Sequence, residues 1–225
     1  MKAPAAVRRA DLERPPAMFT GIITALGRIE STQPLPGEGA GLRVRVATPP
    51  GWLGDAGLGD SICVSGACMT VVELGAEHFV FEVSAESLLR TCGLDQPGAL
   101  LNLEQSLTLS TRLGGHLVTG HVDAVGRVQS FEPAGESRHL VLAAPAELAR
   151  FFAYKGSVVV NGVSLTVNRV DDMPDGSARL HINLIAHTLQ HTNLHELREG
   201  GRGNLEVDLI ARYVQRMLAS PEAQD

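Results

Sequence analysis

The strongest constraint on the fold is an internal repeat in this 225-residue chain. Residues 18–29, MFTGIITALGRI, shifted by 99 positions, align with LVTGHVDAVGRV, and five of the twelve positions are identical. Farther along, SICVSGACMTV (residues 61–71) matches SVVVNGVSLTV (residues 157–167) at five of eleven positions. Two shorter pairs follow in the same order: AESLLRT with AHTLQHT, and NLE at Asn102 with NLE at Asn204. Because a repeated unit folds as a repeated structure, the chain is predicted to contain two similar domains.

Each repeat is predicted to consist of short β-strands. Runs rich in Val, Ile, Leu and Thr lie between the repeated blocks and are bounded by Gly, Pro, Asp and Asn: LRVRVAT, HFVFEVS, HLVLAAP and ARLHINL. This composition is typical of strands joined by turns. Since little room is left for crossover helices, each repeat is predicted to form a small antiparallel β-barrel.

The two ends of the chain lie outside the repeats. Near the C-terminus, apolar residues recur at spacings of three and four, which predicts an amphipathic helix: Ile210, Tyr213, Val214, Met217 and Leu218. Its apolar stripe either packs back on the barrels or joins copies of the chain, and we expect the second. The first 17 residues carry three prolines and charges of both signs but no apolar secretory segment. We expect a disordered leader there, or a start-codon artefact before Met18.

Composition argues against several classes of function. No apolar run approaches the roughly 20 residues that span a bilayer, so a membrane protein is not expected. The net charge of −6 offers no broad positive field for nucleic acid, and a small-molecule ligand is expected instead. The three cysteines lack CxxC spacing, which argues against a disulfide framework or a structural zinc site: Cys63, Cys68 and Cys92. Reduced thiols and a cytoplasmic location are expected.

Each repeat places a polar pair on one face of a strand. Residues two apart on a strand point to the same side, so Ser164 and Thr166 share a face, as do Cys68 and Thr70. Such a pair beside a glycine suits recognition of a polar heterocycle, although a solvated strand face is the plainer interpretation of one copy. Cys68 has its own alternative as a small buried apolar residue. Two copies of the pair suggest two molecules of one ligand.

The two copies are chemically unequal. His121 aligns with Ile22, and Asp208, which follows the second NLE, aligns with Ser106 rather than a carboxylate. Such asymmetry suits a reaction in which two identical molecules play different roles, one giving up a proton and the other being attacked.

His116 and His121 lie five residues apart in the glycine-rich stretch LGGHLVTGHV. A zinc site requires further ligands at recognisable spacing, and neither HExxH nor a nearby cysteine pair is present, so no metal is expected. Histidines held by turn backbone remain a structural alternative. We favour acid–base catalysis, because the pKa of histidine lies near working pH.

Together these motifs resemble the α-type riboflavin synthase family. The resemblance extends from Met18 to about Leu218 and rests on MFTGII, GACMTV, NGVSLTV, GGHLVTGH, AHTLQHTNL and NLEVDLIARYV. It implies an all-β fold of two similar six-stranded antiparallel Greek-key barrels in tandem, with a C-terminal α-helix. The implied organisation is a leader (1–17), an N-terminal barrel (18–114), a C-terminal barrel (115–208), and a trimerisation helix with a tail (209–225).

The resemblance also implies two substrate-binding sites. The first comprises Gly21, Ile22, Ile23, Cys68, Met69, Thr70, Glu82, Val83, Ser84, Ala85, Glu86 and Ser87. The second comprises Gly120, His121, Val122, Lys155, Ser164, Leu165, Thr166, Leu184, Ile185, Ala186, His187, Thr188 and Leu189. The expected catalytic set is Cys68, His116, His121, Ser164, Thr166 and Asp208. Two positions depart from the family pattern: Ser65 replaces an Asn, which we expect to affect the first site, and Cys92-Gly93 interrupts the usual TNL.

The reaction implied by the resemblance is a dismutation of two 6,7-dimethyl-8-ribityllumazine molecules. A four-carbon unit passes between them, giving riboflavin and 5-amino-6-(D-ribitylamino)uracil without a cofactor. A base takes a proton from the methyl group at ring position 7, and water, Cys68 or Ser164 adds to the partner molecule. Much of the rate is expected to come from holding the two rings face to face.

The resemblance further implies a homotrimer, in which each working site pairs the N-terminal barrel of one subunit with the C-terminal barrel of its neighbour. Lumazine synthase is also predicted as a partner. Two rival functions are distinguishable. A non-catalytic lumazine- or flavin-binding protein of the same fold should lack the polar pairs. A flavin reductase should carry a nucleotide-binding α/β domain with a glycine-rich loop, and none is visible.

Overall fold

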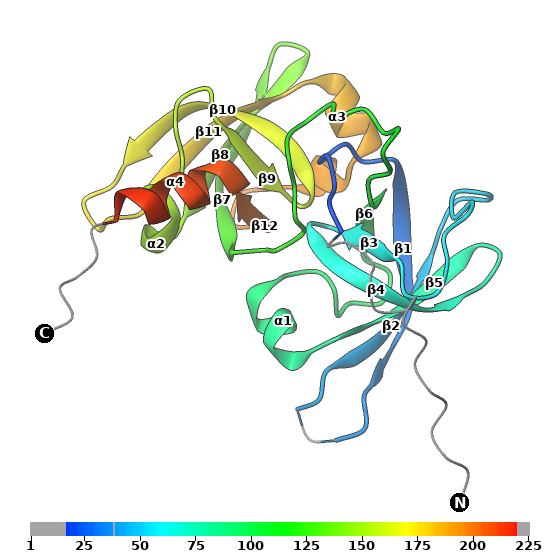
Figure 1. The fold of residues 1–225 in the computed structure, drawn as a ribbon. Coiled ribbons are helices and arrows are strands. Elements are labelled where there is room, and N and C mark those ends of the chain that lie inside the picture. The colour runs from blue at the N-terminus through cyan, green and yellow to red at the C-terminus, as the bar shows by residue number, and fades with distance from the viewer. Residues whose placement is uncertain (1–16, 38, 220–225) are drawn as a thin grey trace, which may run out of the picture.

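The computed structural model describes residues 17–37 and 39–219. The predicted leader therefore lies outside the described residues except for Ala17. In the described part of the chain, each repeat folds into a closed six-stranded antiparallel barrel (Figure 1). The first barrel contains β1 (Ala25–Pro34), β2 (Leu42–Ala47), β3 (Ser61–Val64), β4 (Ala67–Leu74), β5 (His78–Val83) and β6 (Leu100–Gln105). The second contains β7 (Ala124–Ala134), β8 (Ser137–Ala144), β9 (Ser157–Val160), β10 (Val163–Asp172), β11 (Ala178–Leu184) and β12 (Arg202–Val207).

The two barrels have the same topology. Around the first barrel the strand order is β1-β2-β5-β4-β3-β6, and the equivalent strands of the second follow in the same order, β7-β8-β11-β10-β9-β12. The predicted pair of similar Greek-key barrels is confirmed, and the four strand-like runs noted in the sequence are β2, β5, β8 and β11.

Alternation along the strands directs one set of side chains into each barrel. In β2, Val44 and Val46 are fully buried while their neighbours are half-buried. Phe79 and Phe81 fill the same core from β5. The second barrel has a separate apolar core of the same kind. Because each repeat closes on its own core, the outward faces of its strands remain available for solvent or, in β6 and β12, for the contact with the other barrel.

The structure adds short helices that the strand pattern did not predict. AESLLRT and AHTLQHT form α1 (Ala85–Arg90) and α3 (Ala186–His191). Two single turns are also present: α2 (Ala146–Ala149) follows β8, and η2 (Asn193–Glu196) follows α3. Ser84 caps α1 by accepting a hydrogen bond from the Ser87 N–H at 3.1 Å. Six-residue helices present too few turns for an apolar periodicity to be recognisable.

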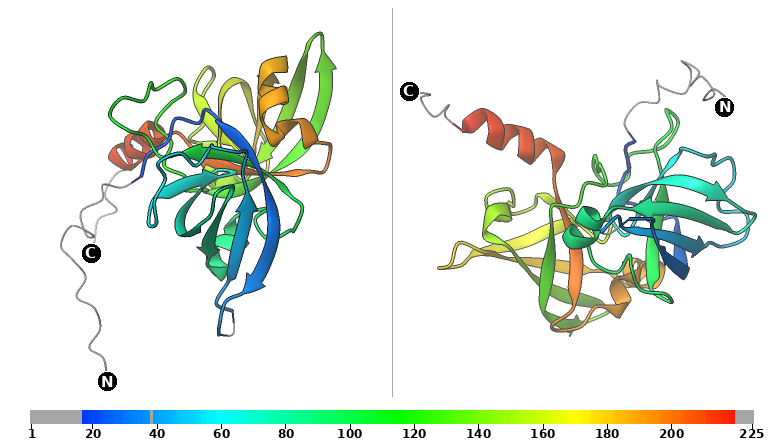
Figure 2. Two further views of the ribbon diagram at one scale, coloured as in Figure 1. Left: turned by 90° about the vertical axis from the view of Figure 1, so that its right-hand side faces the viewer. Right: turned by 90° about the horizontal axis from the view of Figure 1, so that it is seen from below.

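The barrels meet side by side along a buried junction (Figure 2). At its centre Phe19 and Val118 form an antiparallel bridge, with N–O distances of 2.8 and 3.0 Å. The Asn102 side chain donates across the junction to the Asn161 carbonyl at 2.8 Å, and Asn204 donates in the opposite direction to the Ser65 carbonyl at 2.9 Å. Because these buried amides form hydrogen bonds with the opposite barrel, they fix the position of one barrel relative to the other.

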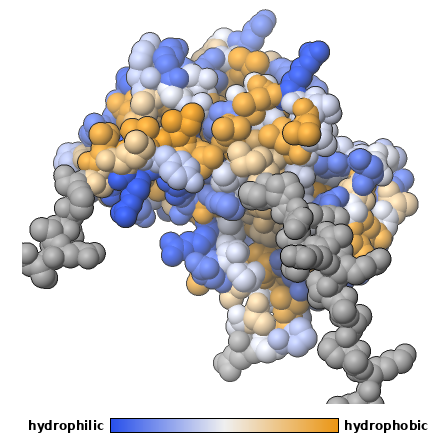
Figure 3. All heavy atoms as spheres, in the orientation of Figure 1, coloured by the Kyte–Doolittle hydropathy of each residue, from blue (hydrophilic) through white to orange (hydrophobic). Residues whose placement is uncertain are grey.

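The predicted C-terminal helix is confirmed as α4 (Leu209–Leu218), which projects from the end of β12 (Figure 2, right). Asp208 caps it by accepting a hydrogen bond from the Ile210 N–H at 2.8 Å. Its five stripe residues are 47–83% exposed, and apolar atoms gather along α4 in Figure 3. The stripe therefore does not pack back on the barrels of its own chain. None of the helices in the described residues is long and apolar enough to cross a membrane.

Candidate functional site

The Thr-Gly segment of each repeat crosses to the barrel of the other repeat. The Gly21 carbonyl accepts a hydrogen bond from the Ser164 N–H at 2.8 Å, and the Gly120 carbonyl accepts one from the Cys68 N–H at the same distance. Ile23, two residues after Gly21, packs against the core of the second barrel. Val122 likewise packs against the core of the first. Each polar strand pair is thus covered by a segment from the opposite repeat.

This crossing corrects the expected grouping of site residues. The segment Gly21–Ile23 was expected beside Cys68, and the segment Gly120–Val122 beside Ser164. The structure reverses both pairings. The reason is that each segment precedes the first strand of its own barrel and reaches the other barrel through the bridge at the junction, which a linear comparison of the repeats does not reveal.

Only glycine fits the two crossing points. Gly21 and Gly120 have φ angles of +75° and +74°. A Cβ at Gly21 would lie 2.6 Å from the Ser164 Cβ, and one at Gly120 would lie 2.7 Å from the Cys68 Cβ. Both the backbone conformation and the close approach therefore require the absence of a side chain.

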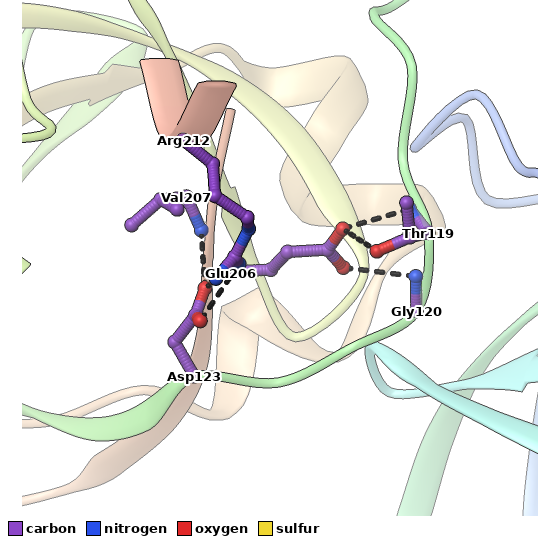
Figure 4. Close-up of polar contacts among 6 residues, drawn as sticks. All are labelled: Thr119, Gly120, Asp123, Glu206, Val207 and Arg212. Carbon is purple, nitrogen blue, oxygen red and sulfur yellow. Dashed lines mark hydrogen bonds and ion pairs between the residues drawn. The ribbon is translucent and has the colours of Figure 1, made fainter. Parts of the chain in front are cut away.

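A buried carboxylate holds each crossing segment. Glu104 accepts hydrogen bonds from the Thr20 N–H (2.7 Å), the Thr20 hydroxyl (2.6 Å) and the Gly21 N–H (2.9 Å). Glu206 accepts the equivalent three from Thr119 and Gly120, at 2.7, 2.8 and 3.0 Å (Figure 4). Burial raises the pKa of both carboxyl groups, and the three donors oppose that shift. Charge-assisted hydrogen bonds of this kind are the strong ones in proteins, so they orient the segments.

Glu104 and Glu206 are not among the site residues predicted from the sequence. A signal was present, because both are the last residue of the repeated NLE and both Thr-Gly pairs are identical between repeats. A carboxylate preserved in both copies at the end of a buried strand indicates a shared structural partner. The pattern did not reveal that this partner is the Thr-Gly segment.

A cavity of about 240 Å³, here named the Cys68 pocket, lies where the second crossing segment covers β4. Gly120, His121 and Val122 line one side. The other side is formed by β4 and α1: Ala67, Cys68, Met69, Glu86, Ser87, Arg90 and Thr91. Burial raises the pKa of the Cys68 thiol, opposed by a hydrogen bond with Ser61, so the neutral thiol is favoured at neutral pH.

The equivalent position in the second barrel carries a serine–histidine pair. The His116 Nδ1 and Ser164 Oγ lie 2.7 Å apart, while the His116 Nε2 is buried without a hydrogen-bond partner. Burial lowers the pKa of His116, and the Asp208 carboxylate opposes that shift. The imidazole is therefore held neutral, in a position to accept the serine proton. His121 lines the Cys68 pocket, whereas His116 contacts Ser164 at a place here named the Ser164 site, so the two histidines do not form one pair.

Several expected site residues are not exposed at the surface. Four are buried in the barrel cores, although the first of them also lines the Cys68 pocket: Met69, Val83, Leu165 and Leu184. Glu82 is exposed and forms an ion pair with Arg43 at 2.8 Å. By contrast, Thr70 and Thr166 are exposed on the faces that the alternation predicts.

The remaining expected residues lie at the helix starts and on one loop. Ser84, Ala85, Glu86 and Ser87 begin α1, and the stretch Ile185–Leu189 begins α3 on the second barrel. Lys155 has a φ angle of +62°, and its Nζ lies 5.4 Å from the centre of the Tyr154 ring. Among the described residues, no three His, Cys, Asp or Glu side chains gather in a way that could hold a metal ion.

Ser65 lies outside the Cys68 pocket. Its side chain is buried at the junction, where Oγ accepts a hydrogen bond from the Asn102 N–H at 3.2 Å. The Ser65 carbonyl accepts from Asn204, and the Asn204 amide oxygen accepts in turn from the Cys92 N–H at 2.7 Å. Both departures from the family pattern therefore lie at the contact between barrels, and the expected effect of Ser65 on the first ligand site has no direct contact to support it.

Comparison with known proteins agrees with this architecture. The lumazine binding domain family matches the chain twice, at residues 20–106 and 119–208. Riboflavin synthase from Photobacterium phosphoreum is 37% identical over 209 residues, covering 92% of each chain. Riboflavin synthase from Brucella abortus is 42% identical over 206 residues, covering 89% of this chain and 98% of the relative. The solved structure of LumP complexed with 6,7-dimethyl-8-(1'-D-ribityl) lumazine superposes with a TM-score of 0.72 at 23% identity, covering 84% of this chain and 98% of LumP.

Proposed function

Because the chain belongs to the riboflavin synthase family and contains two lumazine-binding domains, we propose that it binds one 6,7-dimethyl-8-ribityllumazine in the Cys68 pocket and a second beside Ser164. The observation that carries this proposal is the doubled construction of the site. In each barrel a polar strand residue is covered by a glycine segment from the other repeat, and a buried glutamate holds that segment. Two similar pockets suit two molecules of one substrate.

The chain is an enzyme of the transferase class. A four-carbon unit leaves one lumazine and joins the other, giving riboflavin and 5-amino-6-(D-ribitylamino)uracil. Every atom of the two substrate molecules is found in the two products, so the balance needs neither oxidant nor reductant. The protein therefore has to bind, orient and move protons.

The serine–histidine pair is the proposed source of the nucleophile. The Ser164 hydroxyl adds to the carbon of a ring C=N bond in the lumazine beside it, the π electrons of that bond pass to the nitrogen, and His116 takes the hydroxyl proton through Nδ1. The bond to Ser164 breaks again before the products leave, and the serine recovers its proton. Asp208 stabilises the imidazolium that results, since its carboxylate favours the charged form. Cys68 is a weaker candidate, because its raised pKa leaves little thiolate at neutral pH. Its proposed role is to pack against the ligand.

His121 is the proposed base in the Cys68 pocket. His121 is exposed on the crossing segment that lines the pocket, so its side chain is accessible to a bound ligand. The methyl group at ring position 7 is acidic because its carbanion is delocalised into the pteridine, so a modest base suffices. Thr70 and Thr166 serve as hydrogen-bonding side chains at the pocket rims.

The proposed assembly is a homotrimer in the cytoplasm, joined through the exposed stripe of α4. Five apolar side chains on a short helix are a costly surface for a monomer, and covering them in copies of the same helix removes that cost. In the proposed working site, the Cys68 pocket of one subunit faces the Ser164 site of a neighbouring subunit. An association with lumazine synthase would bring the substrate to these sites.

The test is a conversion assay with purified protein and 6,7-dimethyl-8-ribityllumazine alone, followed by absorbance. Riboflavin should form at half the molar amount of lumazine consumed, without added cofactor. A one-to-one yield, or an absolute requirement for a metal or a nicotinamide, contradicts the proposal. Tight binding without turnover would identify the chain as a ligand-binding relative.

A further inference from the structure

The crossing segment over the Cys68 pocket is held by carboxylates at both ends. At its start, Glu206 accepts hydrogen bonds from Thr119 and Gly120 (Figure 4). At its end lies Asp123, two residues after His121. The Asp123 N–H donates to the Leu205 carbonyl at 2.8 Å, and its Oδ2 accepts from the Val207 N–H at 2.9 Å. The position of His121 is therefore bracketed by two contacts with β12.

The second anchor extends to the C-terminal helix. Nη2 of Arg212, in the first turns of α4, lies 2.7 Å from Oδ1 and 2.9 Å from Oδ2 of Asp123 (Figure 4). The Asp123 side chain is 12% exposed and that of Arg212 is 41% exposed. The pair is thus partly buried. The ion pair with the guanidinium offsets the free-energy cost of removing the Asp123 carboxylate from water.

The anchor exists in one repeat only. The residue equivalent to Asp123 in the first repeat is Thr24, whose hydroxyl donates to the Leu103 carbonyl at 3.3 Å and accepts from the Trp52 ring N–H at 3.0 Å. That arrangement is neutral and lies within the first barrel. The charged version occurs where the chain continues into α4, so the second repeat has gained a connection that the barrel itself does not require.

We propose that Arg212 is a positioning residue, which acts through Asp123 to hold His121 over Cys68 and thereby links the Cys68 pocket of the first barrel to helix α4. The proposal rests on the proposed function for the identity of the ligand. Its consequence is that the helix expected to join subunits also sets the geometry of a pocket in the opposite barrel of its own chain.

Electrostatics supports this assignment. The carboxylates of Asp123 and Glu206 are near enough for Asp123 to raise the pKa of Glu206. Arg212 compensates the charge of Asp123 directly. Without the guanidinium, the partly buried Asp123 carboxylate loses its ion-pair partner, and the segment that it anchors relaxes. Val122 and His121, the two residues that precede Asp123 in the chain, both line the Cys68 pocket and are therefore next to that change.

The experiment compares Arg212→Gln with Arg216→Gln, which removes the same charge from an exposed position one turn along α4. Hydrogen–deuterium exchange of residues 119–123 is measured in the unliganded proteins. Exchange should rise in Arg212→Gln and in Asp123→Asn, stay unchanged in Arg216→Gln, and be partly restored in Arg212→Lys. Equal exchange in Arg212→Gln and Arg216→Gln overturns the proposal, whatever the activity of the protein.

A second measurement separates positioning from assembly. The dissociation constant for 6,7-dimethyl-8-ribityllumazine, obtained by fluorescence titration, should rise by about 5- to 10-fold in Arg212→Gln, the scale of one ordinary hydrogen bond. Sedimentation should show the mass of the unmodified protein. If binding weakens only when the mass falls, and Val214→Glu has the same effect, the ion pair acts through assembly and the proposal is wrong. Failure of the unmodified protein to form riboflavin contradicts the proposed function but leaves the exchange result standing.

Discussion

The backbone N–H of Cys68 donates a hydrogen bond to the Gly120 carbonyl, 2.8 Å away, although the two residues belong to different repeats. The same contact joins Ser164 to Gly21 in the other direction. Each barrel therefore supplies the strand of one pocket and the covering segment of the other. Neither pocket is complete without both repeats, which explains why the repeats are joined by a tight polar junction rather than a flexible linker.

Alanine at Gly120 should disrupt the Cys68 pocket. The new Cβ combines a positive φ angle with a contact 2.7 Å from the Cys68 Cβ. Gly135 is a matched control, because it has a φ of +65° in open space, so Gly135→Ala bears only the conformational cost of about 1–2 kcal/mol. Gly120→Ala should lose about 1–3 kcal/mol more, as overpacked sites do. Urea unfolding measures the difference, and equal losses in the two variants would show that the contact relaxes freely.

Glutamine at Glu206 should loosen the crossing segment. An amide accepts through one oxygen only, so its NH2 group faces the Gly120 N–H that the carboxylate satisfies. A loss of about 1–3 kcal/mol in unfolding free energy is expected, together with weaker lumazine binding. Glu132, exposed on β7, provides the control substitution Glu132→Gln. If both variants are equally stable and bind equally well, the carboxylate does not hold the segment.

The pH dependence of stability should identify His116. Burial lowers its pKa below the ordinary 6.5, so the unfolded chain takes up the proton first as the pH falls. The contribution of the neutral imidazole is complete above 6.5 and is lost as the pH falls from there through the folded-state pKa. Unfolding measured across this range should therefore show a smaller pH dependence in His116→Gln than in the unmodified protein.

The same variant tests the proposed proton transfer. Turnover by His116→Gln should fall by about 10²-fold or more, the contribution of one general base. His78→Gln, on β5 of the first barrel, is the control and should keep normal turnover. A His116→Gln enzyme with normal turnover and an unchanged pH–stability curve would remove His116 from the mechanism.

Mixing inactive variants should reveal a site shared between subunits. His121 lines the Cys68 pocket, and His116 contacts Ser164 at the Ser164 site. Trimers mixed from His121→Ala and His116→Ala chains should therefore contain some interfaces at which two intact pockets face each other, and activity should recover. Mixing His121→Ala with His121→Gln chains removes the proposed base of the same pocket in every chain and should restore nothing. Recovery in the second mixture, or none in the first, contradicts the shared site.

Charges placed on the α4 stripe should dissociate the assembly. Val214→Glu with Met217→Glu introduces carboxylates into a seam that offers them no partners. Sedimentation is expected to show monomers with little activity. Arg216→Glu adds negative charge to the same helix outside the stripe and should leave the mass unchanged. An intact oligomer in the double variant would mean that the subunits associate elsewhere.

Much of the fold was predictable because the determining signals are local. The alternation in β2 and β5, the turn residues between strands and the three- and four-residue spacing in α4 each depend on a few neighbouring side chains. The internal repeat then extended one barrel to two. The same local logic placed Ser164 and Thr166 on one strand face, and Cys68 and Thr70 on another, as the burial pattern confirms.

By itself, the sequence determined which residues carry chemistry and that they occur in two unequal sets. Only the tertiary structure decided which of them meet. Gly120 is 52 positions from Cys68 in the chain, and Glu206 is 87 from Thr119, so no periodicity connects them. Their contacts arise because the bridge between Phe19 and Val118 sends each segment across the junction, where buried donors must find acceptors in whatever barrel lies opposite. The pairing of His121 with Cys68, and of His116 with Ser164, follows from that crossing.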